Sequence, residues 1–270
     1  MQTALFDLPN YNVHNQIYES ANSLIYRAKR INDDCPVVIK IQKHAFPSPE
    51  ELTRYRQEFD ITKKVVHKDV IKAYEIQKYQ NKLFIVLEDI DGCSLKQLLQ
   101  NNQVFCVTTF LELAVHITHT LAGIHAKQII HKDINPANII WNQTTNQLKI
   151  IDFGISSQLP REATHLKNPN QLEGTLAYIS PEQTGRMNCS LDYRTDLYSL
   201  GVTFYEMLTQ KLPYDTVDPL ELVHCHIAKP ITPPCAINRN IPPILSDIIM
   251  KLMAKNVEQR YQSALGLKHD

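Results

Sequence analysis

Glycine is scarce in this chain, with 7 residues among 270, and the first of them is Gly92. That is less than half the share of about 7% found in average soluble domains. Any tight turn before residue 92 must therefore be built from residues that carry side chains. An excess of one charge is also missing, because 28 basic residues balance 28 acidic ones. This balance gives no electrostatic footprint for nucleic acid, so we expect no nucleic-acid partner.

Paired cysteines and long apolar runs are absent as well. The six cysteines form no C-x-x-C pair, and the first residues show no basic stretch followed by an apolar run. No 18 consecutive residues are apolar, so we expect no direct membrane insertion, reduced thiols and a cytoplasmic protein. The cluster His224-Cys225-His226 with Cys235 could be a metal site, but its spacing fits none of the usual zinc patterns. Surface and core residues at a helix end are the favoured interpretation.

The pattern of residue types changes at Gly92. Before it, short β-branched and aromatic segments predict strands at 22–31, 35–43, 71–79 and 82–88. Ser48 followed by Pro49 predicts the start of one helix between these strands. After Gly92, apolar spacing predicts helices at 108–126, 195–209 and 242–254. The inner face expected for the first of these comprises Leu111, Ala114, Val115, Thr118, Leu121, Ala122 and His125.

This pattern predicts an α+β chain with two lobes. We expect a small β-rich lobe with one main helix at 1–88, a hinge at 89–91 and a larger, mainly helical lobe at 92–270. The segment from Asp152 to Glu182 predicts a long loop, which inside a compact domain is usually functional.

The strongest chemical signal is His131-Lys132-Asp133-Ile134-Asn135-Pro136-Ala137-Asn138, followed by Asp152-Phe153-Gly154. A phosphoryl-transfer site needs a carboxylate that orients the attacking hydroxyl and accepts its proton. It also needs oxygen ligands that hold Mg²⁺ on the phosphates. Asp133 suits the first task, and Asn138 and Asp152 suit the second.

These two motifs resemble those of the protein kinase superfamily, H-R-D-x-x-x-x-N and D-F-G. The resemblance extends to Val37-Val38-Ile39-Lys40, which is similar to the kinase V-A-I-K, and to Glu58 in the predicted helix, suitably placed for the Lys–Glu ion pair. It implies the bilobal protein kinase fold, ATP and Mg²⁺ as cofactors, and a protein substrate. The catalytic residues that it implies are Asp133, Lys40, Asn135 and Glu58.

For ATP, the resemblance implies a gatekeeper at Leu87 and a hinge at Glu88 to Ile90. The implied nucleotide contacts are Ile17, Ser20, Ile25, Val38, Lys40, Leu87, Glu88, Ile90, Ser94, Asn138, Ile140 and Asp152. The metal ligands among them are Asn138 and Asp152.

Three further residues resemble structural anchors of the family. Gly174-Thr175-x-x-Tyr178-Ile179-Ser180-Pro181-Glu182 is similar to the end of the kinase activation segment. The resemblance implies that Glu182 pairs with Arg260 and that Asp196, at a helix start, holds the backbone of the catalytic loop. An unpaired buried carboxylate would be costly, which fits these pairings.

The nucleotide loop departs from the family. The kinase pattern G-x-G-x-x-G-x-V aligns with residues 18–25, and its three glycine positions hold Tyr18, Ser20 and Ser23. We still expect a hairpin here, because Asn22 and small neighbours allow a tight turn. Side chains at the glycine positions should keep backbone N–H groups farther from the phosphates, and the two serine hydroxyls are the groups that could recover part of the contact.

The catalytic loop departs from the family at two positions. Asn135 stands where Ser/Thr kinases carry a lysine that neutralises the γ-phosphate, and Lys132 replaces arginine before Asp133. A lysine binds an activation-segment phosphate less specifically than an arginine does. Candidate hydroxyls for such a phosphate are Ser156, Ser157 and Thr164.

Taken together, the sequences of these motifs are similar to those of the N-terminal Ser/Thr kinase domain in large bacterial, cyanobacterial-type proteins. Those proteins continue into ATPase, GAF and histidine kinase regions. We therefore expect further domains on the C-terminal side. The favoured function is a protein serine/threonine kinase in a signalling pathway. The alternatives are a pseudokinase that acts as a nucleotide-sensing scaffold, because of the glycine-free loop and Asn135, and a small-molecule phosphotransferase.

Overall fold

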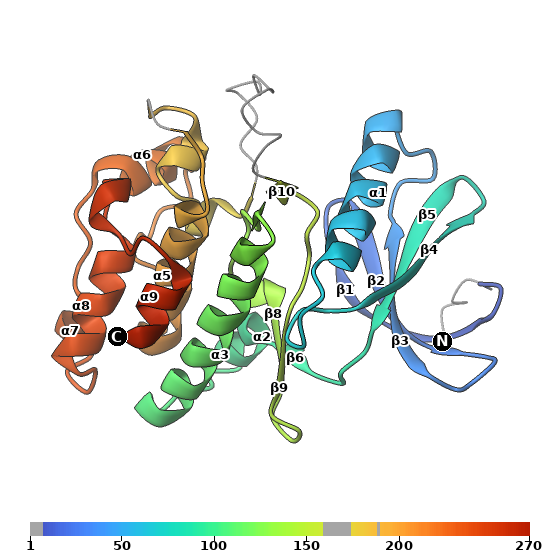
Figure 1. The fold of residues 1–270 in the computed structure, drawn as a ribbon, viewed down its shortest axis with the longest axis horizontal. Coiled ribbons are helices and arrows are strands. Elements are labelled where there is room, and N and C mark those ends of the chain that lie inside the picture. The colour runs from blue at the N-terminus through green and yellow to red at the C-terminus, as the bar shows by residue number, and fades with distance from the viewer. Residues whose placement is uncertain (1–7, 159–173, 188–189) are drawn as a thin grey trace. The chain divides into compact units, whose positions relative to one another are not determined.

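The structure is a computed structural model that describes residues 8–158, 174–187 and 190–270. The chain forms two compact units (Figure 1). The N-terminal unit runs to Gly92 and includes Asp152–Gly154. The C-terminal unit contains Cys93–Ile151 and the described residues from Ile155 onward. The two units are described separately below.

A five-stranded antiparallel sheet forms the N-terminal unit, with the strand order β1-β2-β3-β5-β4. Its strands are β1 (Tyr11–Glu19), β2 (Ser23–Arg30), β3 (Pro36–Gln42), β4 (Ala73–Tyr79) and β5 (Lys82–Glu88). The last four confirm the predicted strands. The pattern does not predict β1, because this strand lies at the edge of the sheet and exposes a run of polar residues from His14 to Gln16. Edge strands are buried on fewer sides, so their alternation is weaker.

One long helix, α1 (Pro49–Lys64), packs on this sheet (Figure 1). It begins with a capping box, in which Ser48 Oγ accepts from Glu51 N and the Glu51 carboxylate accepts from Ser48 N. The helix buries Tyr55, Glu58 and Thr62, and Tyr55 packs with Leu83 and Ile85 of β5. The predicted helix start is therefore confirmed, and its inner face carries a carboxylate among apolar residues.

The C-terminal unit is mainly helical. Its elements are β6 (Cys93–Ser94), α2 (Leu95–Gln100), α3 (Val107–Ala126), β7 (Ile129–Ile130), η1 (Pro136–Asn138), β8 (Ile139–Asn142), β9 (Gln147–Ile150), β10 (Ser157–Gln158), η2 (Leu176–Tyr178), η3 (Glu182–Thr184), α5 (Arg194–Thr209), α6 (Pro219–Ala228), α7 (Pro234–Ile237), α8 (Pro243–Leu252), η4 (Val257–Gln259) and α9 (Ala264–His269). The predicted helices correspond to α3, α5 and α8. Of the predicted loop from Asp152 to Glu182, residues 159–173 lie outside the described residues.

The inner face of α3 differs from the predicted one. The helix buries Phe110, Leu113, Ala114, Ile117, Thr118, Thr120, Leu121 and Ile124. Leu111 and Val115, predicted to be inside, are 41% and 44% exposed. Apolar residues lie almost all round this helix, so spacing alone did not identify the stripe that packs against α9, α5, β7 and β9. Among the described residues α3 is also the one helix that is long and apolar enough, by length and composition alone, to cross a membrane.

The cluster at the end of α6 is a core feature. His224 is exposed, whereas Cys225 and His226 are buried, which confirms the helix-end interpretation. His226 lies between the rings of Tyr198 and Tyr214, with Nδ1 3.0 Å from the Tyr198 hydroxyl. Lys255 Nζ donates to the His226 carbonyl at 2.8 Å. In the described parts of the chain, no three His, Cys, Asp or Glu side chains are grouped so as to hold a metal ion.

We expect His226 to make the protein sensitive to acid. Burial, with the charge of Lys255 adding to it, lowers the pKa of His226 from 6.5 to about 4. The unfolded chain takes up a proton at this histidine below pH 6.5, while the folded chain stays neutral there until about pH 4. Stability that is present above pH 6.5 should therefore be lost as the pH falls towards 4. The loss from this group should be about 2–3 kcal/mol in the free energy of unfolding, measured by urea titration at each pH.

The matched control for this experiment is the exposed His224 on the same helix. His226→Gln should flatten the pH slope of the unfolding free energy between pH 6.5 and 4, and His224→Gln should leave it unchanged. An unchanged slope in His226→Gln would show that another group causes the acid loss.

Candidate active site

In the N-terminal unit, three charged side chains from separate parts of the sequence meet. Lys40 extends from β3, Glu58 from α1, and Asp152 follows β9 in the sequence. Lys40 Nζ lies 2.6 Å from Glu58 Oε1 and 3.1 Å from Asp152 Oδ1. The ion pair expected between Lys40 and Glu58 is therefore formed. The carboxylate of Asp152 is the most exposed of the three groups, with 41% of its side chain accessible.

The charges in this cluster shift the pKa values of its members. Burial alone would lower the pKa of Lys40, but the charges of Asp152 and Glu58 outweigh burial and raise that pKa above its ordinary value. The amine therefore stays protonated. Burial raises the pKa of Glu58 to about 7, with Lys40 opposing the shift and Asp152 adding to it. One fixed cation is thus held between two carboxylates, one of them accessible to solvent.

Asp152 adopts a left-handed backbone conformation, with φ 65°. Its Oδ1 accepts from Gly154 N at 3.1 Å. A Cβ at Gly154 would lie 3.0 Å from Asp152 Oδ1 and 3.5 Å from Glu58 Oε2. Glycine at this position therefore lets the chain pass close to both carboxylates.

An apolar sheet surface adjoins the charged cluster. Ile25 pairs with Lys40, and Val38 pairs with Leu87, in antiparallel register. Directly paired residues share a face, as do residues two apart on one strand. Ile25, Val38 and Leu87 therefore lie on the Lys40 face, and all three are half-buried. Ile17 sits in β1 at a register irregularity and is also half-buried.

The turn between β1 and β2 closes without glycine. Ser20 N donates to Ser23 O at 2.9 Å, and Ser20 Oγ accepts from Ser23 N at 3.0 Å. The predicted hairpin is confirmed. The Ser23 hydroxyl, considered above as a group for phosphate, instead lies 2.6 Å from the hydroxyl of Tyr55 on α1.

The segment after β5 is held by an arginine that the sequence did not indicate. Arg27 Nε lies 3.2 Å from Asp89 Oδ2, and Nη1 lies 2.8 Å from Asp91 Oδ1. Its Nη2 donates to the Gly92 carbonyl at 3.3 Å. Glu88 N donates to Lys72 O at 2.9 Å, so the backbone next to the predicted hinge is anchored on both sides.

In the C-terminal unit, the catalytic loop is organised around Asp133. Its Oδ2 accepts from Asn138 Nδ2 at 2.9 Å, and its Oδ1 accepts from Thr175 N at 3.0 Å. Asn138 Nδ2 also donates to the Asp133 carbonyl at 2.9 Å. The carboxylate is thus fixed by two donors that approach its two oxygens. Gly174 allows the approach of Thr175, because its φ is 99° and a Cβ would lie 3.2 Å from Lys132 O.

Asn135 is enclosed by the same loop and is only 2% exposed. Its Oδ1 accepts from Ala137 N at 2.9 Å, which caps η1. Its Nδ2 donates to the Asp133 carbonyl at 3.1 Å and to Thr175 Oγ1 at 3.3 Å. Every polar atom of the Asn135 side chain is therefore used inside the protein.

The buried carboxylate of Asp196, at the start of α5, fixes the backbone of the catalytic loop. Its two oxygens accept from His131 N at 2.9 Å and from Lys132 N at 2.7 Å. His125 Nε2 lies 2.9 Å from Oδ2. Burial would raise the pKa of Asp196, but His125 and the backbone donor of His131 outweigh it and hold the pKa below its ordinary value. The predicted anchoring of the loop by Asp196 is thus present.

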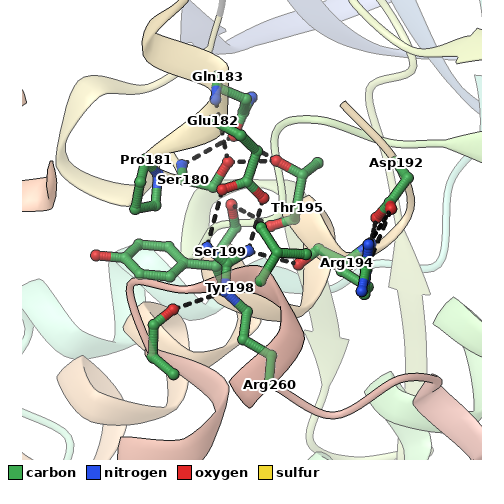
Figure 2. A network of polar contacts seen from close by, with 12 residues as sticks. Ser180, Pro181, Glu182, Gln183, Asp192, Arg194, Thr195, Tyr198, Ser199 and Arg260 are labelled. Carbon is green, nitrogen blue, oxygen red and sulfur yellow. Dashed lines mark hydrogen bonds and ion pairs between the residues drawn. The ribbon is translucent and has the colours of Figure 1, made fainter. Parts of the chain in front are cut away.

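The pair of Glu182 and Arg260 forms a second anchor (Figure 2). Arg260 Nη1 and Nη2 donate to the two Glu182 oxygens at 2.6 and 2.8 Å, and both side chains are buried. Beside them, Gln183 Oε1 accepts from Ser180 N at 3.0 Å, and Gln183 Nε2 donates to the Lys132 carbonyl at 2.8 Å. This network ties the end of the activation-segment motif to the catalytic loop.

The structure thus divides the predicted residues between the two units. Ile17, Ser20, Ile25, Val38, Lys40, Glu58, Leu87, Glu88, Ile90 and Asp152 belong to the N-terminal unit, and Ser94, Asp133, Asn135, Asn138 and Ile140 to the C-terminal unit. Ser94 pairs with Ile140, and its hydroxyl accepts from Gln97 N, which caps α2. Ser156 Oγ donates to His131 O at 3.0 Å. Thr164 lies outside the described residues.

The protein kinase fold has two parts. One is a sheet with a packed helix, in which a lysine of the sheet pairs with a glutamate of the helix, and the other is a helical unit with an anchored loop that carries an aspartate. A family model described as "Protein kinase domain" matches residues 11–270. The chain therefore belongs to the protein kinase family.

Curated relatives from bacteria match most of the chain. A probable serine/threonine-protein kinase of Clostridium acetobutylicum is 31% identical over 255 residues, which is 94% of this chain and 38% of that protein. A probable serine/threonine-protein kinase of Clostridium perfringens is 31% identical over 247 residues, 91% of this chain and 35% of that protein. The serine/threonine-protein kinase PrkC of Bacillus subtilis is 28% identical over 248 residues, 91% of this chain and 37% of that protein. The chain thus spans less than two fifths of these relatives.

Proposed function

We propose that this chain transfers the γ-phosphate of ATP to serine or threonine hydroxyls of a protein substrate. The observation that carries the proposal is the fixed carboxylate of Asp133. Two donors approach its oxygens, Thr175 N at 3.0 Å and Asn138 Nδ2 at 2.9 Å. A carboxylate held in this way can orient a hydroxyl and accept its proton as the phosphoryl group leaves ATP. The curated relatives carry serine/threonine-protein kinase names, which supports this substrate class.

Lys40 is the group proposed to bind the α- and β-phosphates. Its amine stays protonated, and Glu58 fixes its position at 2.6 Å. A lysine on a flexible stem is otherwise poorly oriented, so the ion pair should set the direction of the ammonium group. Ile25, Val38 and Leu87, half-buried on the same sheet face, are proposed to contact the adenine. The proposed hinge contacts are at Glu88 and Ile90.

The donor atoms suit Mg²⁺, which the protein kinase family uses together with ATP. Mg²⁺ prefers carboxylate and amide oxygens, and Asp152 is a partly exposed carboxylate. Asn138 gives its Nδ2 to Asp133, which leaves its amide oxygen as the atom for a metal. When bound, the ion would neutralise phosphate charge. Asp152 and Asn138 are therefore the proposed ligands.

Asn135 is proposed to act by position and not by charge. Because its side chain is buried and bonds only to the protein, it does not replace the lysine that meets the γ-phosphate in other kinases. It links the backbone of Asp133 to the hydroxyl of Thr175. Asn135 and the glycine-free turn suggested a pseudokinase, but each is hydrogen-bonded within its own unit, and the chain keeps Lys40, Asp133 and Asp152.

The cellular location and the domain context of the chain are proposed from the resemblance of its motifs to the kinase domain of large bacterial proteins. We place the chain in the cytoplasm, in a signalling pathway, and with further domains on its C-terminal side. The substrate proposed is a polypeptide and not a small molecule. The reason is the elaborate anchoring of the segment from Thr175 to Gln183, which suits the docking of a chain.

Calorimetry of ATP binding with Asp152→Asn tests the nucleotide site. The wild type should bind ATP more tightly with Mg²⁺ than with a chelator. Asp152→Asn should lower the affinity in Mg²⁺ by about tenfold or more, the scale of one lost charge-assisted contact. Asp60→Asn, which removes an exposed carboxylate from α1, is the matched control and should change nothing. Unchanged Mg²⁺-dependent binding in Asp152→Asn would refute the assignment.

A further inference from the structure

A hydroxyl pair joins the β1–β2 turn to α1. Ser23 Oγ lies 2.6 Å from Tyr55 Oη. Ser23 is 4% exposed and Tyr55 is 7% exposed, so water does not compete for this contact. Ser23 is the first residue of β2 and pairs with Gln42 at the end of β3. The bond therefore fixes the point at which the chain leaves the turn.

Tyr55 connects this point with the charged cluster. It lies one helical turn before Glu58, on the same buried face of α1. The Lys40 amine lies 5.9 Å from the centre of the Tyr55 ring, within the range of a cation–π contact. The tyrosine thus touches the turn with its hydroxyl and Lys40 with its ring, while the next turn of the helix carries the partner of Lys40.

We propose that Ser23 and Tyr55 are positioning residues, which fasten the β1–β2 turn to the helix that holds Glu58 on Lys40. The turn and the Lys40–Glu58 pair then keep one arrangement before the nucleotide arrives. This role rests on the proposed function, because its value lies in binding the phosphates of ATP. A glycine at position 23, as in the family pattern, has no hydroxyl and cannot make this connection.

The internal bonds of the turn support the same role. Ser20 Oγ accepts from Ser23 N at 3.0 Å, and Ser20 N donates to Ser23 O at 2.9 Å. The segment is therefore closed on itself and attached to α1 at its end. A segment that is ordered in the free protein loses less conformational entropy when a ligand binds. A glycine loop lets its backbone approach the phosphates closely. Here the two serines instead hold the β1–β2 turn in one conformation before ATP binds.

The test is a double-mutant cycle with Ser23→Ala, Tyr55→Phe and the double variant, in this 270-residue chain. Each single change should raise the KM for ATP by about three- to tenfold, the scale expected for one buried hydrogen bond. The double variant should be no worse than either single one, because each partner acts only through the other. Affinity for adenosine, which lacks phosphates, should stay within about twofold of the wild type, since its hinge contacts are untouched.

The matched control is Tyr26→Phe. Tyr26 lies on the same β2 strand, and its hydroxyl donates to Gln16 Oε1 of β1 at 3.2 Å, away from α1. This change removes a sheet hydroxyl of the same kind and should leave the KM for ATP unchanged. Additive effects of Ser23→Ala and Tyr55→Phe would overturn the proposal. An equal loss of ATP and adenosine affinity would also overturn it, because it would indicate a general disturbance of the sheet.

Hydrogen exchange separates this proposal from the proposed function. In the absence of nucleotide, backbone amides of residues 18–25 should exchange faster in both single variants than in the wild type and in Tyr26→Phe. This readout needs no activity. If the wild type transferred no phosphate but showed this pattern, the proposed function would fail and the fastening would stand. Unchanged exchange in Ser23→Ala and Tyr55→Phe would refute the fastening in an active kinase.

Discussion

Replacing Asp133 by asparagine should lower kcat for phosphoryl transfer by about 10²–10⁴-fold and leave the affinity for ATP nearly unchanged. An asparagine fits the same space but cannot accept a proton from the substrate hydroxyl. It also places an amide NH2 group, which donates hydrogen bonds, against one of the two donors Thr175 N and Asn138 Nδ2, which face carboxylate oxygens in the wild type. None of the contacts given above for Asp133 involves Lys40, Glu58 or Asp152, so we expect the Lys40 cluster to keep its ion pairs. Steady-state kinetics and calorimetry together measure the two effects.

The control for this variant is Asp247→Asn, an exposed carboxylate on α8. It makes the same chemical change at a residue that takes part in none of the catalytic-loop contacts described above, and it should keep wild-type kinetics. If Asp133→Asn transferred phosphate as fast as the wild type, Asp133 would not be the group that handles the hydroxyl. A parallel loss of ATP affinity would point to a collapsed loop.

Breaking the buried pair of Arg260 and Glu182 should cost the most stability. Arg260→Met leaves the Glu182 carboxylate buried without its bidentate partner. The loss of one member of such a pair costs about 3–5 kcal/mol, because an uncompensated charge remains in the interior. We expect this decrease in the free energy of unfolding, measured by urea titration.

The double variant Arg260→Met/Glu182→Gln should recover part of the loss, since it removes both charges and leaves no unpaired charge in the interior. Arg194→Met is the matched control. Arg194 pairs with Asp192 and with Glu258, whose side chain is largely exposed (Figure 2 shows the first pair). Its loss should cost about 1 kcal/mol or less. If Arg260→Met cost no more than Arg194→Met, the pair would not be an anchor of the fold.

The contacts that could be predicted best from the sequence are those between charged groups in buried segments, where each group needs a partner. Lys40 stands in an apolar strand, and Glu58 lies on the inner face of the one helix expected nearby. The family resemblance implied this pairing, and the burial expected for both groups supported it, because a buried charge needs a partner. Asp196 and Glu182 follow the same logic, since each is a carboxylate within a buried segment and each finds the expected donors.

Contacts between uncharged groups could not be predicted in this way. Ser23 and Tyr55 are 32 residues apart on different elements, and neither breaks the pattern of its own element. A serine in a turn and a tyrosine on a helix have many possible partners, so only the packing of α1 on the sheet selects this one. The face of α3 shows the same limit, because Leu111 and Val115 are as apolar as the residues that are buried.

Asn135 shows what a motif alone does not predict. Its place in the motif indicated the loss of a cation at the γ-phosphate, but not that its amide bonds to Asp133, Ala137 and Thr175. A lysine at that position extends further and carries a charge, whereas an asparagine is short enough to bond to its own loop. The change of residue type therefore changes what the side chain can reach.

The most direct test of serine/threonine kinase activity is transfer of labelled γ-phosphate from ATP to a generic protein substrate in the presence of Mg²⁺. The assay compares the wild type with Asp133→Asn and with the control Asp247→Asn, followed by identification of the phosphorylated amino acid. We expect phosphoserine or phosphothreonine with the wild type and the control, and a signal lower by about 10²-fold or more with Asp133→Asn. A folded wild-type protein that binds ATP but transfers no phosphate above the level of Asp133→Asn would contradict this expectation.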